Sequence, residues 1–326
     1  MKLIQPPLHV LLAFAIFLIF LGGPQIVGIA LGNIGGILLV RDLNAPSQLN
    51  KQRLVYAKNC LILSTNLVPE RATIQRALGY VVFLEGDMEE ALYIWRKTPG
   101  SEVWLLSRGI TAYRLSAYEE ARLWLDTTTQ VKPDLGKAWY YLGLSYNKLE
   151  QPEKAWEALR LAEEQADSQP IISSIYHSQG DLLADTSAGL PEALRLYDMA
   201  LDADRFIEAW RRRDAYYAQG EVLLQLGQYD EAIQSFQAVL ALYNDHYWAR
   251  VRLGRAIWLA SGSLEDAERY YLEAIDLNPS EKSAYRWLAL TYQEAGQIQE
   301  ATIVYRKVLE IDPEDKMALE FLGEAP

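Results

Sequence analysis

The side chains that most often carry catalysis or hold metals are scarce in this chain of 326 residues. Its three histidines, His9, His177 and His246, stand too far apart in the sequence pattern to share a site. Its single cysteine, Cys60, rules out an internal disulfide framework and any cysteine-cluster metal centre. The glycines form no phosphate-binding or dinucleotide-binding loop. The sequence therefore predicts no catalytic residue, no metal site and no cofactor.

Adjacent acidic residues are frequent, and a carboxylate pair can supply a general acid and a general base. The examples are Glu89/Glu90, Glu119/Glu120 and Glu163/Glu164. They fall near predicted helix starts or on outer faces, where negative charge favours the helix dipole or is simply solvated. We therefore predict that the protein is not an enzyme.

Basic residues gather in one part of an otherwise acidic chain. They are "RRR" (211–213), Arg250, Arg252 and Arg255. Two interpretations remain open: a solvated helix start with ordinary ion pairs, or an anchor for an acidic peptide or an anionic head group. The whole chain carries a formal net charge of −12. A general nucleic-acid binder needs a basic face, so we predict no nucleic-acid partner.

A repeated pattern indicates the elements that position these side chains. An alanine recurs every 30 to 39 residues, with a large apolar residue four positions after it and a small residue 12 or 13 positions before it. The alanines are Ala91, Ala121, Ala155, Ala193, Ala232, Ala267 and Ala301. The large residues are Trp95, Leu125, Leu159, Tyr197, Phe236, Tyr271 and Tyr305. The small residues are Gly79, Gly109, Gly143, Gly180, Gly220, Gly254 and Ala289.

Each unit of this pattern predicts two antiparallel amphipathic helices, with apolar residues at i, i+3, i+4 and i+7. The small residue on the first helix and the alanine on the second mark where the two axes pass closely. We expect the large residue to fill the space toward the next unit. One helix pair cannot cover its own apolar face, so the units must stack and bury a continuous core.

The spacing resembles that of the tetratricopeptide repeat (TPR) family. The stretch "WYYLGLSYNKLEQPEKAWEAL" carries the family pattern at Trp139, Leu142, Gly143, Tyr146, Ala155 and Leu159. The resemblance implies an all-α, right-handed superhelical α-solenoid of about seven helix pairs over residues 72–315. Residues 43–71 are then a linker and an N-terminal capping helix, and residues 316–326 a C-terminal capping helix.

Two stretches depart from the pattern. An insertion, "DTSAGL", precedes Pro191, and the connection at 162–172 is long. We expect an altered twist there, with two sub-arrays meeting near residues 165–172.

The resemblance also implies a concave groove lined by the first helices, at positions three before, one after and four after the small residue. Many side chains at these positions are aromatic with a polar edge, as is common at binding hot spots. Chaperone-binding members of the family hold a terminal carboxylate with Lys and Asn in consecutive units, a set that this chain lacks. The predicted partner-binding residues are Tyr80, Tyr113, Tyr140, Asn147, His177, Tyr217, Glu221, Trp248, Arg255, Trp258 and Arg286.

The amino-terminal part differs from the rest, because no charged residue occurs from Leu8 to Val40. A run of this length predicts a membrane segment within residues 1–42. It can be a single anchor, or a short hairpin turning at residues 22–25, in which Gly28, Gly32 and Gly36 let two helices approach closely. It can also be a cleaved signal peptide.

Together these patterns predict a non-catalytic, membrane-anchored TPR scaffold or adaptor at the cell membrane, with the side of the array left open. Its concave groove would bind a protein or peptide, and residues 8–40 would contact the membrane. The alternative is an accessory subunit of a membrane enzyme or transporter complex that docks through residues 8–40.

Overall fold

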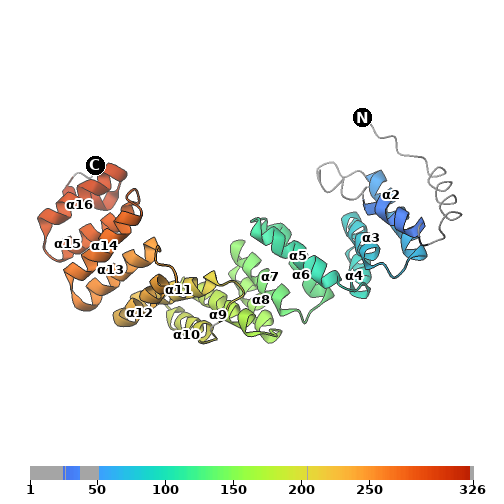
Figure 1. The fold of residues 1–326 in the computed structure, drawn as a ribbon, viewed down its shortest axis with the longest axis horizontal. Coiled ribbons are helices and arrows are strands. Elements are labelled where there is room, and N and C mark those ends of the chain that lie inside the picture. Colours follow the sequence, from blue (N-terminus) through green and yellow to red (C-terminus); the bar gives the residue numbers. More distant parts are fainter. Residues whose placement is uncertain (1–24, 26, 37–50, 204, 324–326) are drawn as a thin grey trace. The chain divides into compact units, whose positions relative to one another are not determined.

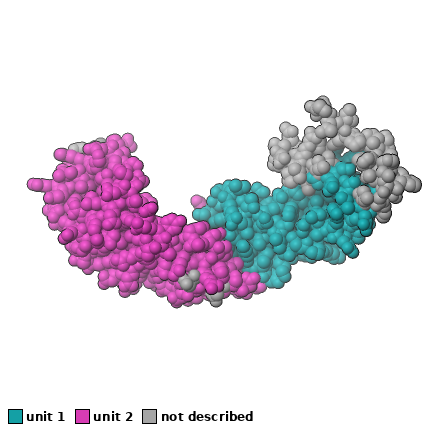
Figure 2. Space-filling model, viewed as in Figure 1, with its two compact units in different colours: residues 1–149 teal, residues 150–326 magenta. Residues whose placement is uncertain are grey.

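The computed structural model describes residues 25, 27–36, 51–203 and 205–323. Within these residues the chain is all helical and has no strand (Figure 1), which confirms the predicted all-α class. The chain divides into two compact units, unit 1 (residues 1–149) and unit 2 (residues 150–326), coloured separately in Figure 2.

Besides a helical stretch at residues 27–36, unit 1 contains a single helix, two helix pairs and a further single helix. Its helices are α2 (Lys51–Leu67), α3 (Ala72–Glu85), α4 (Met88–Lys97), α5 (Ser101–Arg114), α6 (Tyr118–Val131) and α7 (Gly136–Lys148). Short turns join α3 to α4 and α5 to α6, and the two helices of each pair pack along one another. Helix α2 packs against α3, at the position where the capping helix is predicted.

Unit 2 contains four complete pairs and two single helices. Its helices are α8 (Pro152–Glu164), α9 (Gln169–Ala184), α10 (Leu190–Asp202), α11 (Trp210–Gln225), α12 (Tyr229–Leu242), α13 (Tyr247–Ser261), α14 (Leu264–Leu277), α15 (Lys282–Glu294), α16 (Ile298–Ile311) and α17 (Lys316–Leu322). The pairs are α9/α10, α11/α12, α13/α14 and α15/α16, and α17 packs against α16.

The division between the units differs from the predicted meeting of sub-arrays near residues 165–172. It falls between Leu149 and Glu150, because α8 packs with α9 despite the long connection between them. The two helices of the predicted third pair, which carry Gly143 and Ala155, therefore belong to different units.

The repeated residues pack within their own pair. The recurring spacing places all seven alanines of the second helices in the core, and each is fully buried. A Cβ atom added to Gly220 would lie 2.7 Å from the ring of Phe236, and one added to Gly180 would lie 2.7 Å from that of Tyr197. The expectation that the large residue fills space toward the next unit is therefore incomplete. A glycine leaves a notch in the first helix, and the ring from its own second helix occupies that notch.

A left-handed backbone residue separates the two helices of most pairs. It is Gly86 (φ 94°) after α3, Gly227 (φ 75°) after α11 and Gly296 (φ 77°) after α15. Ser116 takes this conformation after α5, with φ 60°. Glycine adopts it freely, whereas a side chain adds strain of about 1 kcal/mol.

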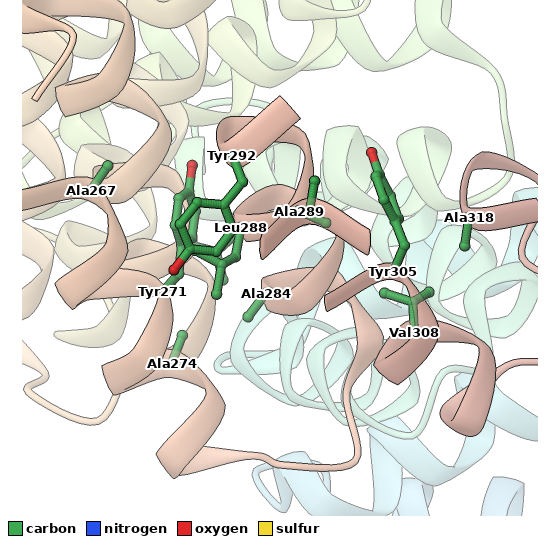
Figure 3. Close-up of a cluster of buried hydrophobic side chains, with 12 residues drawn as sticks. Ala267, Tyr271, Ala274, Ala284, Leu288, Ala289, Tyr292, Tyr305, Val308 and Ala318 are labelled. Atoms are coloured by element: carbon green, nitrogen blue, oxygen red, sulfur yellow. The ribbon is translucent and has the colours of Figure 1, made fainter. Parts of the chain in front are cut away.

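The carboxyl-terminal pairs bury an aromatic cluster (Figure 3). Tyr271 of α14 and Tyr305 of α16 are fully buried among alanines. The ring of Phe321 on α17 lies 4.6 Å from that of Tyr305, measured between centroids. Helix α17 therefore covers the apolar face of the last pair, as a cap must in a repeat array.

Part of the uncharged amino-terminal run packs onto helix α2. Residues 27–36 are helical, and Val27 and Leu31 are buried against Cys60 of α2. Ser64 Oγ donates a hydrogen bond to the carbonyl oxygen of Gly28 at 2.5 Å.

Glycines again permit the close approach. A Cβ on Gly28, Gly32 or Gly35 would meet side chains of the cap and of α3 at 2.8 Å, whereas one on Gly36 would meet nothing. These glycines therefore allow residues 27–36 to pack closely against α2, α3 and the segment between them. The third close contact is made by Gly35 and not by the predicted Gly36.

No helix among the described residues combines the length and the apolar character that crossing a membrane requires. Most of the predicted membrane segment, including His9 and most of the proposed turn at 22–25, lies outside the described residues. The membrane segment therefore stays a prediction.

Candidate partner-binding surface

In unit 2 the first helices of successive pairs lie next to one another. Helix α11 contacts α13, and α13 contacts α15. The predicted groove positions recur once per pair, so their side chains come together across this row of helices. We call this surface the first-helix surface, and its residues are Tyr217 and Glu221 on α11, Arg252, Arg255 and Trp258 on α13, and Arg286, Trp287 and Glu294 on α15.

Ion pairs join the helices of this surface in succession. Glu221 of α11 lies 2.7 Å from Arg252 Nε of α13. Arg255, one turn further along α13, holds Glu294 of α15 with two hydrogen bonds of 2.6 and 3.1 Å. This bidentate geometry fixes both side chains and orients the guanidinium plane. Each pair is partly exposed, so its contribution to stability is about 0.5–1 kcal/mol.

Aromatic rings lie among these charges. The Trp287 ring is within cation–π range of both Arg252 and Arg255, at 5.6 and 5.2 Å from their guanidinium carbons. Trp258 Nε1 donates a hydrogen bond to Glu294. The contacts hold both indole rings in place, so the surface presents apolar rings at a low entropic cost of ordering.

Burial changes the pKa values of two side chains on α11, Tyr217 and Glu221. Burial raises the pKa of Glu221, against the opposing effect of Arg252, and it also raises the pKa of Tyr217. The Tyr217 ring packs on Phe236 and on His246, at centroid distances of 5.7 and 5.4 Å. Tyr217 and Glu221 are therefore half-buried side chains with polar ends directed toward Arg252.

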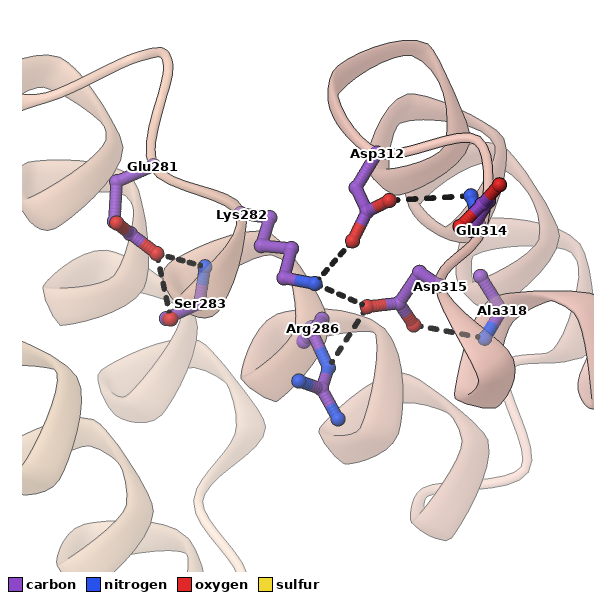
Figure 4. A network of polar contacts seen from close by, with 8 residues as sticks. All are labelled: Glu281, Lys282, Ser283, Arg286, Asp312, Glu314, Asp315 and Ala318. Atoms are coloured by element: carbon purple, nitrogen blue, oxygen red, sulfur yellow. Dashed lines mark hydrogen bonds and ion pairs between the residues drawn. The ribbon is translucent and has the colours of Figure 1, made fainter.

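The surface ends at a polar network beside α17 (Figure 4). Asp315 is buried, accepts a hydrogen bond from the Ala318 amide at 3.2 Å, and lies 3.1 Å from Lys282 Nζ. Arg286 Nε approaches the same carboxylate at 3.5 Å, and Lys282 also binds Asp312. A cavity of about 100 Å³ adjoins this network, lined by Ser283, Arg286, Trp287, Leu290 and Met317.

The structure supports the ion-pair interpretation of the basic cluster around residues 211–255. In unit 2, carboxylates pair with five of its arginines: Arg211 with Glu208, Arg213 with Asp214, Arg250 with Glu273, Arg252 with Glu221 and Arg255 with Glu294. The cluster is therefore close to neutral and is no open anion site.

Three predicted groove residues lie in the core instead. Tyr80, Tyr140 and His177 have exposed fractions of 5%, 0% and 5%. His177 packs against Tyr197 and Phe206, because α9 turns this position toward its own pair. The family's groove positions therefore do not hold for these three residues.

The other predicted residues are at least partly exposed. Tyr217, Glu221, Arg255, Trp258 and Arg286 belong to the first-helix surface. Trp248, at the start of α13, is 42% exposed and lies on the same helix. In unit 1, Tyr113 packs between Tyr118 and Tyr141, and Asn147 is half-buried near the end of α7.

Trp287 and Glu294, which complete the surface, were not predicted from the sequence, and Arg252 was predicted only as a member of the basic cluster. A signal was present in the helical spacing. Arg252 and Arg255 are three residues apart, so they share a face of α13, and acidic residues occur at comparable positions on the helices at either side.

Two sequence-family models match the chain, both described as tetratricopeptide repeat, over residues 211–280 and 259–316. Among solved structures, PilW, titled a widely conserved type IV pilus biogenesis factor, is 19% identical with a TM-score of 0.58, and the match covers 68% of this chain and 98% of PilW. The pilF protein of Pseudomonas aeruginosa is 16% identical with a TM-score of 0.56, over 69% of this chain and 97% of that one.

YrrB, titled a TPR protein with an unusual peptide-binding site, is 20% identical with a TM-score of 0.52, and the match covers 61% of this chain and 97% of YrrB. No curated protein sequence matches the chain. At these identities the structural likeness shows the fold alone. The alternating helices, the notch-filling rings and the two family matches agree, and the chain contains tetratricopeptide repeats, which the family models match over residues 211–316.

Proposed function

We propose that the protein is a non-catalytic scaffold or adaptor that binds a partner polypeptide across the first-helix surface of unit 2. Proteins of this repeat family generally mediate protein–protein interactions. The observation that carries the proposal is the row of Trp258 and Trp287 held in place by the pairs Glu221–Arg252 and Arg255–Glu294. Rings fixed in this way lose little entropy when a partner covers them.

The chemistry of the surface favours a polypeptide as the ligand. Its arginines are already paired with carboxylates, so the surface offers no strong preference for a free anion. It offers indole and phenol rings for apolar side chains and half-exposed polar ends for backbone amides. That YrrB is titled as having a peptide-binding site supports this class of ligand for the fold.

The proposal includes attachment to a membrane through residues 8–40. Residues 27–36 pack on α2 and α3, which leaves the uncharged stretch 8–24 for contact with lipid. That stretch has 17 residues, about the shortest length that spans a bilayer as a helix. Membrane fractionation of the full chain and of a form lacking residues 1–24 tests this part. Equal partition of both forms would contradict it.

The partner-binding part is tested with two matched double variants. Trp258→Ala/Trp287→Ala removes the two rings of the surface, and Leu272→Ala/Ile303→Ala truncates two exposed residues on the second helices α14 and α16. Partners are cross-linked in cells, extracted in detergent and identified by mass spectrometry, after circular dichroism has shown that both variants fold. We expect partners to be lost in the first variant only. Partners retained in the first variant and lost in the second would refute the proposed surface.

A second candidate is an accessory subunit that docks on a membrane enzyme or transporter through residues 8–40. It is favoured by the exposure of Val55, Ile62 and Leu63 on α2, the helix that contacts residues 27–36. The discriminating experiment replaces residues 1–24 with an unrelated membrane anchor and leaves residues 27–36 in place. A scaffold should keep its function after the exchange, whereas a subunit docked through this segment should lose it.

A further inference from the structure

An arginine in unit 1 is enclosed by aromatic rings. The guanidinium carbon of Arg108, on α5, lies 4.9 Å from the ring centroid of Tyr80, 5.2 Å from that of Trp104 and 4.5 Å from that of Trp124. These rings come from α3, α5 and α6, and they also contact one another, with Tyr80 and Trp124 at 5.5 Å. We call Arg108 and its three rings the arginine box.

The guanidinium of the arginine box has no carboxylate partner among the described residues. Its Nε is buried and makes no hydrogen bond. No described residue forms a hydrogen bond with its two Nη atoms either, yet they are not buried, so they reach the surface of this half-buried side chain. By contrast, Arg252 and Arg255 of unit 2 each face a glutamate.

This arrangement leaves part of the bonding capacity of Arg108 unused. The rings compensate the faces of the cation through their π electrons. They cannot accept the in-plane N–H bonds, of which a guanidinium has five. The rings also exclude water from one side and hold the plane in one orientation. A carboxylate arriving in that plane would therefore gain a charge-assisted bidentate contact with little loss of side-chain entropy.

We propose that the arginine box binds the carboxylate of an aspartate or glutamate on a partner polypeptide, through the two Nη atoms of Arg108. The half-exposed ring of Trp104 would contact the methylene groups of that acidic side chain. The inference rests on the proposed function only in taking a polypeptide as the ligand. It concerns unit 1 and uses no residue of the first-helix surface.

The charges nearby favour a carboxylate over a phosphate. Glu120 accepts a hydrogen bond from Trp124 Nε1 at 3.1 Å, so an anion already stands at the wall of the arginine box. With Arg108 as the cation and Glu120 as the anion already beside it, the site can bind one further group with a single negative charge. A phosphate group carries nearly two charges at neutral pH and would meet stronger repulsion from Glu120.

The sequence carried a signal for this site. Arg108 directly precedes Gly109, the small residue of its unit. The family pattern has leucine at the position that Arg108 occupies, and four other units have one there: Leu78, Leu142, Leu253 and Leu288. An arginine in place of that leucine needs a local compensation, which here is the set of three rings.

The test uses the full chain in detergent and two fluorescein-labelled nonapeptide libraries. One has a fixed central glutamate and the other a central glutamine, with the same mixture of residues around it. Fluorescence anisotropy measures binding to the wild type, to Arg108→Met, and to Arg114→Met as a control. Arg114 is an exposed arginine on the same helix α5. Circular dichroism establishes that each variant is folded.

We expect the wild type and Arg114→Met to bind the glutamate library at least about 10-fold more tightly than the glutamine library, and Arg108→Met to lose this difference. Glu120→Gln, which keeps an acceptor for Trp124, should bind the glutamate library more tightly than the wild type. This milder variant also tests the site if Arg108→Met fails to fold.

Three results would overturn the inference. The first is equal binding of both libraries by the wild type. The second is an unchanged preference for glutamate in folded Arg108→Met. The third is Arg108-dependent binding to phosphatidylglycerol vesicles without any preference for the glutamate library. The variant Trp258→Ala/Trp287→Ala separates the two proposals, because it should retain the glutamate preference even where it loses partners in cells.

Discussion

The substitution Gly220→Ala tests whether the notch in the first helix sets the packing of a pair. A Cβ at this position would lie 2.7, 2.8 and 3.0 Å from three ring atoms of Phe236. Favourable contacts between carbon atoms begin at about 3.5 Å, so the nearest overlap is about 0.8 Å. Phe236 is fully buried, and its ring cannot withdraw into solvent.

Two opposing terms decide the size of the effect. Alanine favours a helix over glycine by about 1 kcal/mol. Overpacking a well-filled core costs about 1–3 kcal/mol. We therefore expect Gly220→Ala to lower the free energy of unfolding by up to about 2 kcal/mol, although alanine is the better helix former. Helix propensity cannot explain a loss of stability on replacing a mid-helix glycine by alanine. Such a loss would indicate overlap with the Phe236 ring.

The measurement is urea unfolding of the whole chain, followed by far-ultraviolet circular dichroism, with the slope checked for unchanged cooperativity. A double-mutant cycle with Phe236→Leu isolates the contact. The smaller leucine side chain should relieve the overlap. The double variant should therefore lose less free energy of unfolding than the two single variants lose together, by about 1 kcal/mol or more. Additive effects, or a stabilising Gly220→Ala, would refute the packing model.

The remaining predictions concern a turn, a cap and a buried histidine. Ser116 and Gly296 both have a left-handed backbone, which glycine adopts without strain. Ser116→Gly should therefore raise the free energy of unfolding by about 0.5–1 kcal/mol, and Gly296→Ala should lower it by a similar amount. Changes of the opposite sign in urea unfolding would contradict this. Asp315→Ala should lower it by about 1–2 kcal/mol through loss of the α17 cap, whereas an unchanged unfolding midpoint would show that α17 adds no stability. Burial lowers the pKa of His177 below its usual value near 6.5, so only the unfolded chain takes up this proton readily as the pH falls. The contribution of His177 to stability is therefore complete above pH 6.5 and declines below it, by at most about 1.4 kcal/mol per pH unit, and His177→Phe should remove that decline. A stability difference between wild type and His177→Phe that stays constant from pH 7.5 to pH 5 would exclude this titration.

The helix pairs and their buried alanines were predicted from the sequence, whereas the contact of each large residue with the glycine of its own pair was found only in the structure. The contact between a first-helix glycine and the ring from its second helix joins residues only 16 or 17 positions apart, as in Gly220 with Phe236 and Gly180 with Tyr197. Short-range contacts of this kind depend on helical periodicity and on one turn, both of which the residue types encode. The alternation of helices, the buried alanines and the two terminal single helices followed from the same periodicity.

Only the tertiary structure decided which charged side chains are paired and which groove positions are exposed. Arg255 meets Glu294 across 39 residues, whereas Arg108 meets rings from two other helices and pairs with no carboxylate in the part of the chain that the structure describes. Such contacts depend on the rotation of each helix about its axis and on how neighbouring pairs stack. A shift of one position along a helix turns the direction of a side chain by about 100°. His177 was predicted to line the groove and lies in the core for that reason. The repeat pattern specifies each pair, and the stacking of pairs determines the binding surfaces.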